Sequence, residues 1–336
     1  MTTALPSPAD PPTPLVCPHT GWGVLRVAGS DAVAFLQGQL SSDVAALHPG
    51  EGQYWSYNSP KGRILANGVL WRAPAGGTDD GLVMLLAGDL AEAIRRRLSM
   101  FVLRAKVRIE DATQSNALIG LAGDGCAVAA RGALGVAPEA ARAVAFDGGA
   151  TAFALPDRRI VILAPVPNGP IVQAALARHA SVVEADAWRL AGIAAGVPWI
   201  GAATSDLFVP QMVNWDVLGG VSFRKGCYPG QEIVARMQYL GRLKERLFAF
   251  RTGALEVAPA TRLYSAAFGA DQACGTVVDA APDRAGGTAL LAVAQLAAVE
   301  ADDLALGEPG GARLVRVPLP YDVPPGESSE SRGRSR

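Results

Sequence analysis

Short apolar runs separated by turn residues recur along the first two-thirds of the chain, and runs of this length predict β-strands. Two of them, Gln53–Tyr57 and Ile64–Trp71, flank the turn Asn58-Ser59-Pro60-Lys61-Gly62 and are expected to pair. The other predicted strands in this part are Trp22–Ala28, Leu82–Ala87, Lys106–Ile109, Leu118–Leu121, Ala143–Phe146, Thr151–Ala154 and Ile160–Leu163.

Helices are predicted between these strands. Ser30 is expected to cap one helix, and Asp89 is expected to cap a second helix with Glu92 in the capping-box position. Two further helices are predicted over Pro170–His179 and Glu184–Ala195. The alternation of strands and helices indicates an α+β fold, arranged as two interleaved ferredoxin-like units.

The pattern changes after about Gly241, where short β-like segments are split by Gly and Pro. They predict a small all-β barrel or sandwich of roughly eighty residues. These segments are Leu247–Arg251, Arg262–Tyr264, Gly275–Val278, Ala289–Val293 and Ala312–Val317. The predicted organisation is an α+β region over residues 15–240 and a C-terminal β-barrel over residues 241–323. Residues 1–14 are rich in Pro, Ser and Thr, and residues 324–336 are polar. Both segments are expected to be disordered.

Composition and charge exclude several classes of protein. Hydrophobic residues make up 50% of the 336 residues, which excludes wholesale disorder. The 30 basic and 31 acidic residues give a net charge of −1, so no global field favours nucleic acid. The N-terminal segment lacks a basic start followed by an apolar run. We therefore expect no signal peptide, no membrane span and a cytoplasmic location.

The three histidines and four cysteines make a resident metal site unexpected. No two cysteines form a C-x-x-C pair, so neither a Cys-only zinc site nor a cluster scaffold is indicated. Four scattered cysteines in a chain of this length are typical of reduced thiols in a cytosolic protein. We expect no stably bound metal.

The segment from Phe223 to Arg236, FRKGCYPGQEIVAR, carries the most chemical information. Two glycines and a proline within five residues predict a tight turn, and the residues after Gly230 have helical composition. A helix N-terminus and the neighbouring Arg224 and Lys225 would favour the thiolate form of Cys227. Cys227 is thus a candidate reactive thiolate or transient ligand. The alternative is a small buried hydrophobe in a turn.

Other segments offer polar, charged or aromatic groups to a ligand. Glutamine amides can bond a planar heterocycle, basic residues in a hairpin turn can bind an anionic tail, and an indole can stack on a ring. The residues that carry these groups are Gln37, Gln39, Lys61, Arg63, Trp199, Gln211 and Asn214. Each has an ordinary alternative as an outer helix position, a solvated turn, a core aromatic or a backbone-bonded amide. The basic cluster Arg95-Arg96-Arg97 is either a solvated helix end or an RNA contact.

The string Lys225-Gly226-Cys227-Tyr228-Pro229-Gly230-Gln231-Glu232 resembles the signature of the YgfZ family, the folate-binding relatives of the glycine-cleavage aminomethyltransferase. Further segments follow in the order found in that family. They are Phe35–Val44, Tyr57–Leu65, Arg104–Val107, Gly196–Pro198 and Pro210–Asn214. The resemblance spans roughly residues 20–320.

The resemblance implies an aminomethyltransferase-like ring of three parts around a central cavity that binds tetrahydrofolate. It also implies a monomeric accessory protein that helps to make or maintain [4Fe–4S] enzymes, including radical enzymes that modify tRNA. The functional cysteine of the family and its adjoining lysine map onto Cys227 and Lys225. The residues expected to contact folate are Gln37, Asp43, Lys61, Arg63, Trp199, Gln211, Asn214, Gln231, Glu232 and Arg236.

Two departures separate this chain from the aminomethyltransferase relatives. Those relatives carry an Asp pair after a hairpin, where this chain has Ala66-Asn67 and no carboxylate. They also carry a Glu-Ala-Gly whose Glu binds the pterin, where this chain has Ala194-Ala195-Gly196. An amine substrate would lack its proton-handling partner, which disfavours aminomethyl transfer. Asp43, Gln211 or Glu232 would then have to bind the pterin.

Three hypotheses follow, in descending order of support. The first is a folate-dependent accessory factor for iron–sulfur proteins that has no or little catalytic activity of its own. The second is a folate-dependent aminomethyl or one-carbon transferase, against which the missing carboxylate counts. The third is a protein that binds tRNA directly, for which a net charge of −1 gives little basis.

Overall fold

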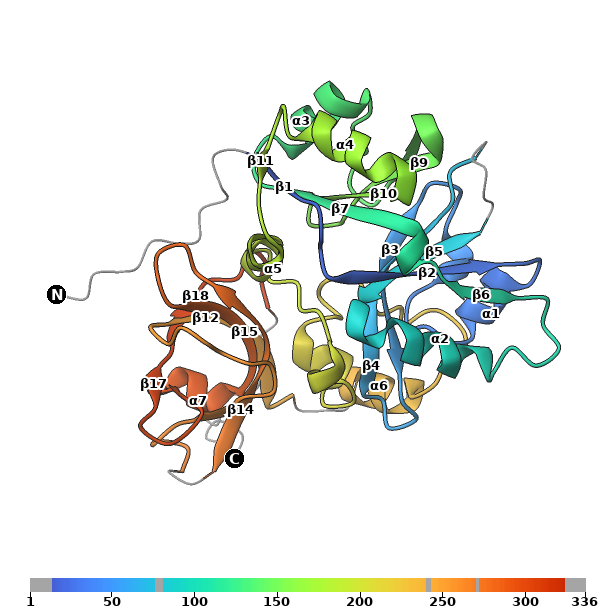
Figure 1. Ribbon diagram of the computed structural model, residues 1–336. Helices are drawn as coiled ribbons and strands as arrows, with labels where there is room; N and C mark the ends of the chain where they lie inside the picture. Colours follow the sequence, from blue (N-terminus) through green and yellow to red (C-terminus); the bar gives the residue numbers. More distant parts are fainter. Residues whose placement is uncertain (1–13, 76–80, 240–242, 270–271, 324–336) are drawn as a thin grey trace.

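The computed structural model describes residues 14–75, 81–239, 243–269 and 272–323, and it contains three β-sheets with helices packed on them (Figure 1). Residues 1–13 and 324–336, nearly all of the predicted disordered ends, lie outside the described residues. Residues 240–242, at the predicted boundary before the barrel, also lie outside them. The domain boundaries therefore stay predictions.

One sheet is built from the N-terminal part of the chain and has the strand order β3-β4-β5-β2-β6. Its strands are β2 (Trp22–Ala28), β3 (Gly52–Asn58), β4 (Ile64–Arg72), β5 (Leu82–Ala87) and β6 (Arg108–Asp111). Helices α1 (Ala32–Gln37) and α2 (Ala91–Ser99) bury Leu36 and Leu98 in the same hydrophobic cluster as Trp55 of β3. The predicted pairing around the turn at Asn58–Gly62 is confirmed, because β3 and β4 form an antiparallel ladder.

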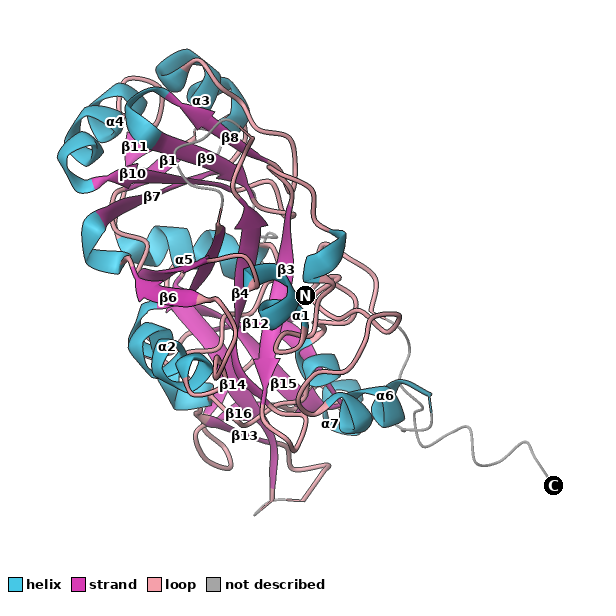
Figure 2. Ribbon diagram, turned by 90° about the vertical axis from the view of Figure 1, so that its right-hand side faces the viewer, coloured by secondary structure: helices cyan, strands magenta, loops and turns pink. Residues whose placement is uncertain are grey.

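A second sheet has the strand order β11-β1-β7-β10-β9-β8, and α3 and α4 cover one of its faces (Figure 2). These elements are β1 (Leu15–Cys17), β7 (Asn116–Ala122), β8 (Ala143–Phe146), β9 (Ala150–Ala154), β10 (Ile160–Pro165), β11 (Ser181–Val182), α3 (Cys126–Leu134) and α4 (Gly169–Leu176). The chain begins in this sheet with β1, completes the five-stranded sheet, and then returns. The predicted interleaving of two α+β parts is therefore confirmed.

The C-terminal sheet is antiparallel and curls back on itself. Its order is β17-β16-β13-β14-β15-β12-β18. Its elements are β12 (Glu245–Thr252), β13 (Arg262–Tyr264), β14 (Ala273–Pro282), β15 (Thr288–Gln295), α7 (Leu296–Glu300), β16 (Ala305–Leu306), β17 (Ala312–Arg313) and β18 (Val315–Val317). The two edge strands, predicted as one strand, are separated only by buried Leu314, so one stretch of chain pairs with both ends of the sheet. The aminomethyltransferase-like fold class is confirmed.

Helix α5 (Ala185–Ala194) lies between the C-terminal sheet and the rest of the molecule (Figure 1). It contacts β14 and β15 on one side and β1 and β7 on the other. Helix α6 (Gln231–Tyr239) follows the cysteine-containing turn. The short 3₁₀ segments are η1 (Val44–Ala46), η2 (Gly88–Leu90), η3 (Thr113–Ser115), η4 (Asp147–Gly149), η5 (Val166–Asn168), η6 (Ala202–Thr204) and η7 (Pro210–Val213).

Both predicted helix caps are wrong. The Asp89 carboxylate binds a distant backbone donor, and the N-cap residue of α1 is Asp31 instead of Ser30. The Asp89 carboxylate accepts a hydrogen bond from the backbone N–H of Ala202 at 2.9 Å, and α2 begins after Leu90. Ser30 lies one residue before the actual N-cap, Asp31, and neither makes a side-chain capping bond. Asp31 instead accepts the backbone N–H of Lys106 at 2.8 Å. These two carboxylates join separate segments rather than stabilise helix ends.

Candidate functional site

The turn that carries Cys227 packs backbone against backbone on the β3–β4 hairpin turn. Gly230 and Gly62 have φ values of 76° and 73°, a region that favours glycine. A Cβ atom at Gly230 would lie 2.4 Å from the carbonyl oxygen of Ser59 and 2.7 Å from Cα of Gly62. The two glycines are therefore required by this close approach, which fixes Cys227 relative to the N-terminal sheet.

Lys225 is buried and its ammonium group is fully engaged by backbone. Nζ donates hydrogen bonds to the carbonyl oxygens of Gln37 at 2.5 Å, Leu40 at 2.6 Å and Ser42 at 3.1 Å. Burial lowers the pKa of Lys225 to about 8, against the opposing effect of Asp43. Lys225 thus attaches the Cys227 turn to the C-terminal end of α1, where carbonyls lack helical partners. This contact gives the lysine a positioning role, and a catalytic role stays a prediction.

Cys227 differs from the other three cysteines in exposure. Cys17, Cys126 and Cys274 are buried, whereas Cys227 is exposed. Burial raises the pKa of Cys17 and raises that of Cys274 to about 11. Because the thiolate is the reactive form, thiol chemistry with a partner is available at Cys227 rather than at these buried residues.

Several predicted folate contacts are engaged by the protein itself. Gln37 donates to Asp43 at 3.0 Å and accepts from the backbone N–H of Ala45. Buried Gln211 donates to the carbonyl of Val234 at 2.8 Å, and buried Asn214 donates to the carbonyl of Leu247 at 3.1 Å. These amides and Asp43 hold neighbouring segments together.

The remaining candidates near Cys227 lie on the hairpin turn and on α6. Lys61 and Arg63 are exposed, and Arg63 donates to the carbonyl oxygens of Asp206 and Leu207. Residues Gln231, Glu232 and Arg236 all belong to α6, and the last two are exposed. The structure therefore places five candidates beside the cysteine turn, on a partly basic surface, whereas it places Trp199 elsewhere.

Trp199 lies in a cavity of about 300 Å³ that is lined by strands of the N-terminal and C-terminal sheets, by α5 and by Arg159, which directly precedes β10 of the second sheet. Trp22 begins β2, Trp188 lies in the middle of α5, and the barrel contributes Val278 and Asp279 of β14. The Trp22 and Trp199 rings stack with centroids 3.7 Å apart, and Trp22 meets Trp188 edge-on at 5.1 Å. The three indoles thus pack on one another in the wall of the cavity, and aromatic walls of this kind are common in ligand pockets.

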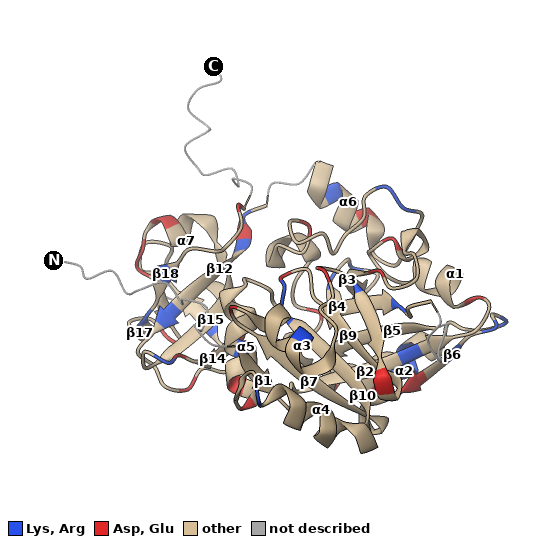
Figure 3. Ribbon diagram, turned by 90° about the horizontal axis from the view of Figure 1, so that it is seen from above, with Lys and Arg blue, Asp and Glu red and all other residues tan. Residues whose placement is uncertain are grey.

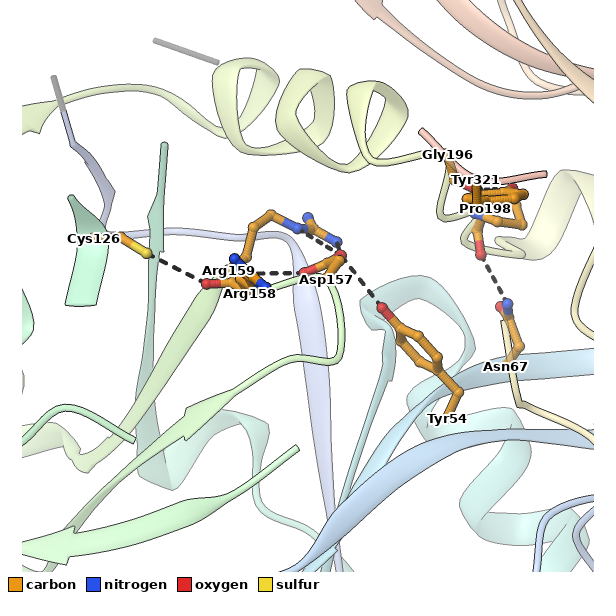
Figure 4. Close-up of polar contacts among 9 residues, drawn as sticks. All are labelled: Tyr54, Asn67, Cys126, Asp157, Arg158, Arg159, Gly196, Pro198 and Tyr321. Carbon is orange, nitrogen blue, oxygen red and sulfur yellow. Dashed lines mark hydrogen bonds and ion pairs between the residues drawn. The ribbon is translucent and has the colours of Figure 1, made fainter. Parts of the chain in front are cut away.

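Local structure explains how the third indole reaches this cavity. A Cβ atom at Gly120 of β7 would lie 2.6 Å from the Trp188 ring, so only glycine leaves room for it. The loop with Trp199 is held by Asn67, whose side chain donates to the carbonyl of Pro198 at 2.8 Å (Figure 4). The same side chain accepts a hydrogen bond from the backbone N–H of Ile200, also at 2.8 Å. Asn67 stands at the position where the aminomethyltransferase relatives are expected to carry a carboxylate. Its side-chain oxygen and nitrogen are both hydrogen-bonded to backbone groups.

Charged groups line the same cavity. Arg159 is buried and forms a 2.7 Å ion pair with Asp157, which also accepts a hydrogen bond from Tyr54 (Figure 4). The Arg159 guanidinium lies 4.6 Å from the centroid of the Trp188 ring. Burial raises the pKa of Asp279 to about 7, although Arg189 and Arg159 oppose this shift. The cavity thus combines aromatic planes with one buried cation and one buried carboxyl.

Sequence reasoning missed Trp22, Trp188, Arg159 and Asp279. Each lies far from the others in the chain, and the only available signals were the glycines Gly120 and Gly192, which face Trp188 and Arg159. Among the predicted folate contacts, only Trp199 lines this cavity. The cysteine turn contacts the hairpin end of β4, whereas the cavity loop contacts Asn67 farther along the same strand, and no residue of the cysteine turn lines the cavity.

No membrane-crossing helix and no metal-binding cluster were found in the part of the chain that the structure describes. Its helices are too short or too polar to span a bilayer. None of its groupings of His, Cys, Asp and Glu reaches the three ligands of a metal site.

Comparison with known proteins identifies relatives that are similar to this chain over most of its length. A scan against models of protein families gave no match. The tRNA-modifying protein YgfZ of Enterobacter sp. (strain 638) is 31% identical over 305 residues, covering 90% of this chain and 91% of that protein. The protein of the same name from Pectobacterium carotovorum subsp. carotovorum (strain PC1) is 29% identical over 330 residues, covering 95% and 97%.

One solved structure shares the fold across nearly the whole chain. The glycine cleavage system aminomethyltransferase T from Bartonella henselae superposes with a TM-score of 0.72 at 16% identity, covering 96% of this chain and 89% of that one. At this identity the likeness concerns the fold alone, and it confirms the aminomethyltransferase-like architecture expected from the sequence.

Proposed function

Since this chain belongs to the YgfZ family, we propose that it is a folate-dependent accessory protein for [4Fe–4S] proteins, including enzymes that modify tRNA. The observation that carries the proposal is the cavity formed by Trp22, Trp188 and Trp199. An aromatic wall can stack on the flat pterin ring of tetrahydrofolate, and the carboxyl and guanidinium groups that line the cavity offer partners for its polar edges. The name of the relatives supports the link to tRNA modification.

A second observation supports a reduced folate as the ligand of this cavity. The indole N–H groups of Trp188 and Trp199 are buried without a hydrogen-bond acceptor among the described residues. Such groups are costly unless something supplies an acceptor. A pterin carries ring nitrogens and a carbonyl oxygen that can serve as acceptors after small side-chain adjustments. Trp22, Trp188, Trp199 and Arg159 would hold the ring, and the folate would supply its one-carbon chemistry when bound.

Cys227 is the proposed point of contact with iron–sulfur clients. Its thiol is exposed on a turn that two glycines and Lys225 fix in place. A thiol in this position can ligate iron transiently or exchange with a thiol of the client. Because no residue of the cysteine turn lines the cavity, folate would act on the protein's affinity for clients rather than on the sulfur itself.

The structure offers less support for the other two functions. An aminomethyltransferase needs a carboxylate near the folate amine, and Asn67 is instead bonded to Pro198 and Ile200. Direct tRNA binding needs a basic surface, whereas Lys and Arg are interspersed with Asp and Glu over the ribbon (Figure 3). We therefore retain the accessory role.

Titration of the purified protein with tetrahydrofolate tests the cavity. We expect saturable quenching of tryptophan fluorescence, and at least tenfold weaker binding for Trp22→Phe and Trp188→Phe. Trp71→Phe is the matched control, since Trp71 stacks on Phe153 in the core and does not line the cavity. Absence of saturation at millimolar ligand would remove the folate part of the proposal.

Complementation tests the thiol. Cells that lack the gene are expected to lose activity of [4Fe–4S] enzymes and the tRNA modifications that depend on them. The wild-type gene should restore both, and Cys227→Ala should not, whereas Cys274→Ala serves as the buried control. Full restoration by Cys227→Ala would exclude the thiol from the mechanism.

A further inference from the structure

Helix α6 directly follows the cysteine turn and buries few of its side chains against the rest of the protein. Of its nine residues, Val234 alone is buried. The carbonyl of Val234 accepts a hydrogen bond from the side chain of Gln211 at 2.8 Å. On the outer side of the helix, Ile233 and Tyr239 are 38% and 70% exposed. This outer side is therefore available to another molecule.

The outer side of α6 continues into the turn of the β3–β4 hairpin, next to which the helix lies (Figure 1). A Cβ atom at Gly62 would lie 2.8 Å from Cβ of Ile233, so Ile233 packs on the turn between Lys61 and Arg63. The exposed residues of α6, the cysteine turn and the hairpin turn thus share one surface. We call it the cysteine face, and its members are Lys61, Arg224, Cys227, Ile233, Arg236 and Tyr239.

The cysteine face carries more available cations than carboxylates. Lys61, Arg224 and Arg236 are exposed, and none of them forms an ion pair with another residue that the structure describes. Glu232 is an exposed carboxylate of α6, and Asp206 of the adjoining loop already accepts a hydrogen bond within the protein. The excess of positive charge around Cys227 favours an anionic partner.

The apolar residues and the thiol distinguish between anionic partners. A nucleic acid would use the cations, but its phosphate backbone has no counterpart for Ile233 or for the sulfur of Cys227. An acidic polypeptide segment can supply carboxylates for the cations, an apolar side chain for Ile233 and Tyr239, and a cysteine for Cys227. The observations therefore favour a polypeptide over RNA.

We propose that the cysteine face docks an acidic segment of the client protein, one that carries an apolar side chain and the cysteine that Cys227 serves. The inference rests on the proposed function, because it assumes that Cys227 contacts clients. It adds the class of partner that is recognised. It also gives a role to Lys61 and Arg236, which were expected to contact folate but do not line the cavity.

Two peptides of equal length test the charge preference with the full-length protein. Each carries a leucine and a cysteine held as a mixed disulfide with thionitrobenzoate, and the cysteine is flanked by aspartates in one peptide and by lysines in the other. The Cys227 thiolate attacks the peptide sulfur, the bond between the two peptide-reagent sulfurs breaks, and thionitrobenzoate leaves as a coloured thiolate. We expect the acidic peptide to react at least about tenfold faster at low salt. In about 1 M salt the difference should nearly vanish.

Paired charge reversals locate the source of this preference. Lys61→Glu combined with Arg236→Glu should abolish or invert it. Arg131→Glu combined with Arg178→Glu is the matched control, because both arginines are exposed on the helical layer of the second sheet and the net charge changes equally. Circular dichroism checks that both variants fold, and Cys227→Ala gives the background rate. Equal losses of preference in the two variants would overturn the inference, since overall charge would then explain them.

The apolar part of the cysteine face is tested separately. Tyr239→Ala should slow the reaction of the acidic peptide several-fold, because the leucine loses a contact. The same variant should react with the small symmetrical disulfide of thionitrobenzoate at the wild-type rate. Equal slowing with both reagents would contradict docking, because it would show that the substitution changes the thiol itself.

The outcomes distinguish this inference from the proposed function. If the acidic and basic peptides react equally fast at low salt while Cys227→Ala still fails to restore the client enzymes, the inference is wrong and the proposed function stands. If tRNA protects Cys227 from the small disulfide and the acidic peptide shows no preference, the face binds RNA and the inference is wrong. If Cys227→Ala restores the client enzymes fully, the thiol part of the proposed function fails and the inference fails with it.

Discussion

Among single residues, Cys227 has the property on which its proposed role depends, which is access from solvent. The three other thiols are buried. We expect iodoacetamide to modify one thiol of the native protein rapidly, at Cys227, as located by peptide mass spectrometry. The Cys227→Ala variant should lose this fast phase entirely, while unfolding in urea should expose the remaining three thiols. A fast second site in the native protein would contradict the burial of the others.

Asp279 makes the stability of the protein depend on pH. Its pKa is about 7 in the folded protein against 3.8 as the ordinary value. Between these values the folded state keeps a proton that the unfolded state has lost, so the stabilisation is present at low pH and is lost as pH rises through 7. Asp279→Asn should gain about 1–2 kcal/mol over the wild type between pH 5 and pH 8, measured by urea unfolding. A constant difference would show that Asp279 is not buried.

The reactivity of a residue could be predicted from the sequence only where it depends on residues that are adjacent in the chain. The turn around Cys227 was visible because Lys225, Gly226 and Gly230 are adjacent in sequence. The indole cavity was not visible, because Trp22 and Trp188 are brought together by the interleaved sheets and by space left at Gly120. Lone tryptophans in a sequence carry no sign of such a partner.

Among the elements, the cysteine turn and the β3–β4 hairpin turn depend on each other. Gly230→Ala would place a methyl group against the Ser59 carbonyl in a backbone conformation that favours glycine. We expect a loss of about 2 kcal/mol or more and a lower melting temperature in calorimetry. Gly226→Ala is the control, because a Cβ atom there meets nothing within 4 Å. Equal effects of both substitutions would show that the two turns do not pack tightly.

Strands were predictable and helix caps were not. Runs such as Trp22–Ala28, Leu82–Ala87 and Arg262–Tyr264 match the observed strands, because apolar composition and turn residues are local signals. Helix α3 was not predicted, because its residues are mostly Ala and Gly and show no clear periodicity. The cap at Asp89 was wrong because Ala202, over a hundred residues away, takes its carboxylate.

In the whole molecule, the chain returns after the barrel to the bend that follows α5. The hydroxyl of Tyr321 donates to the carbonyl of Gly196 at 2.7 Å, and a Cβ atom at Gly196 would lie 2.7 Å from the Tyr321 ring (Figure 4). Burial raises the pKa of Tyr321 to about 12. This contact connects the C-terminal segment to the loop that carries Trp199, and thus connects the barrel to the cavity.

Tyr321→Phe should therefore affect both stability and ligand binding. Removing the hydroxyl leaves the Gly196 carbonyl without this donor, which should cost about 1 kcal/mol in urea unfolding. It should also weaken tetrahydrofolate binding several-fold, because the bend before Trp199 loses a restraint. Tyr239→Phe is the control, since Tyr239 is 70% exposed and its hydroxyl should contribute nothing measurable. If Tyr321→Phe lowered stability and left folate affinity unchanged, the C-terminal segment would hold the barrel without influencing the cavity.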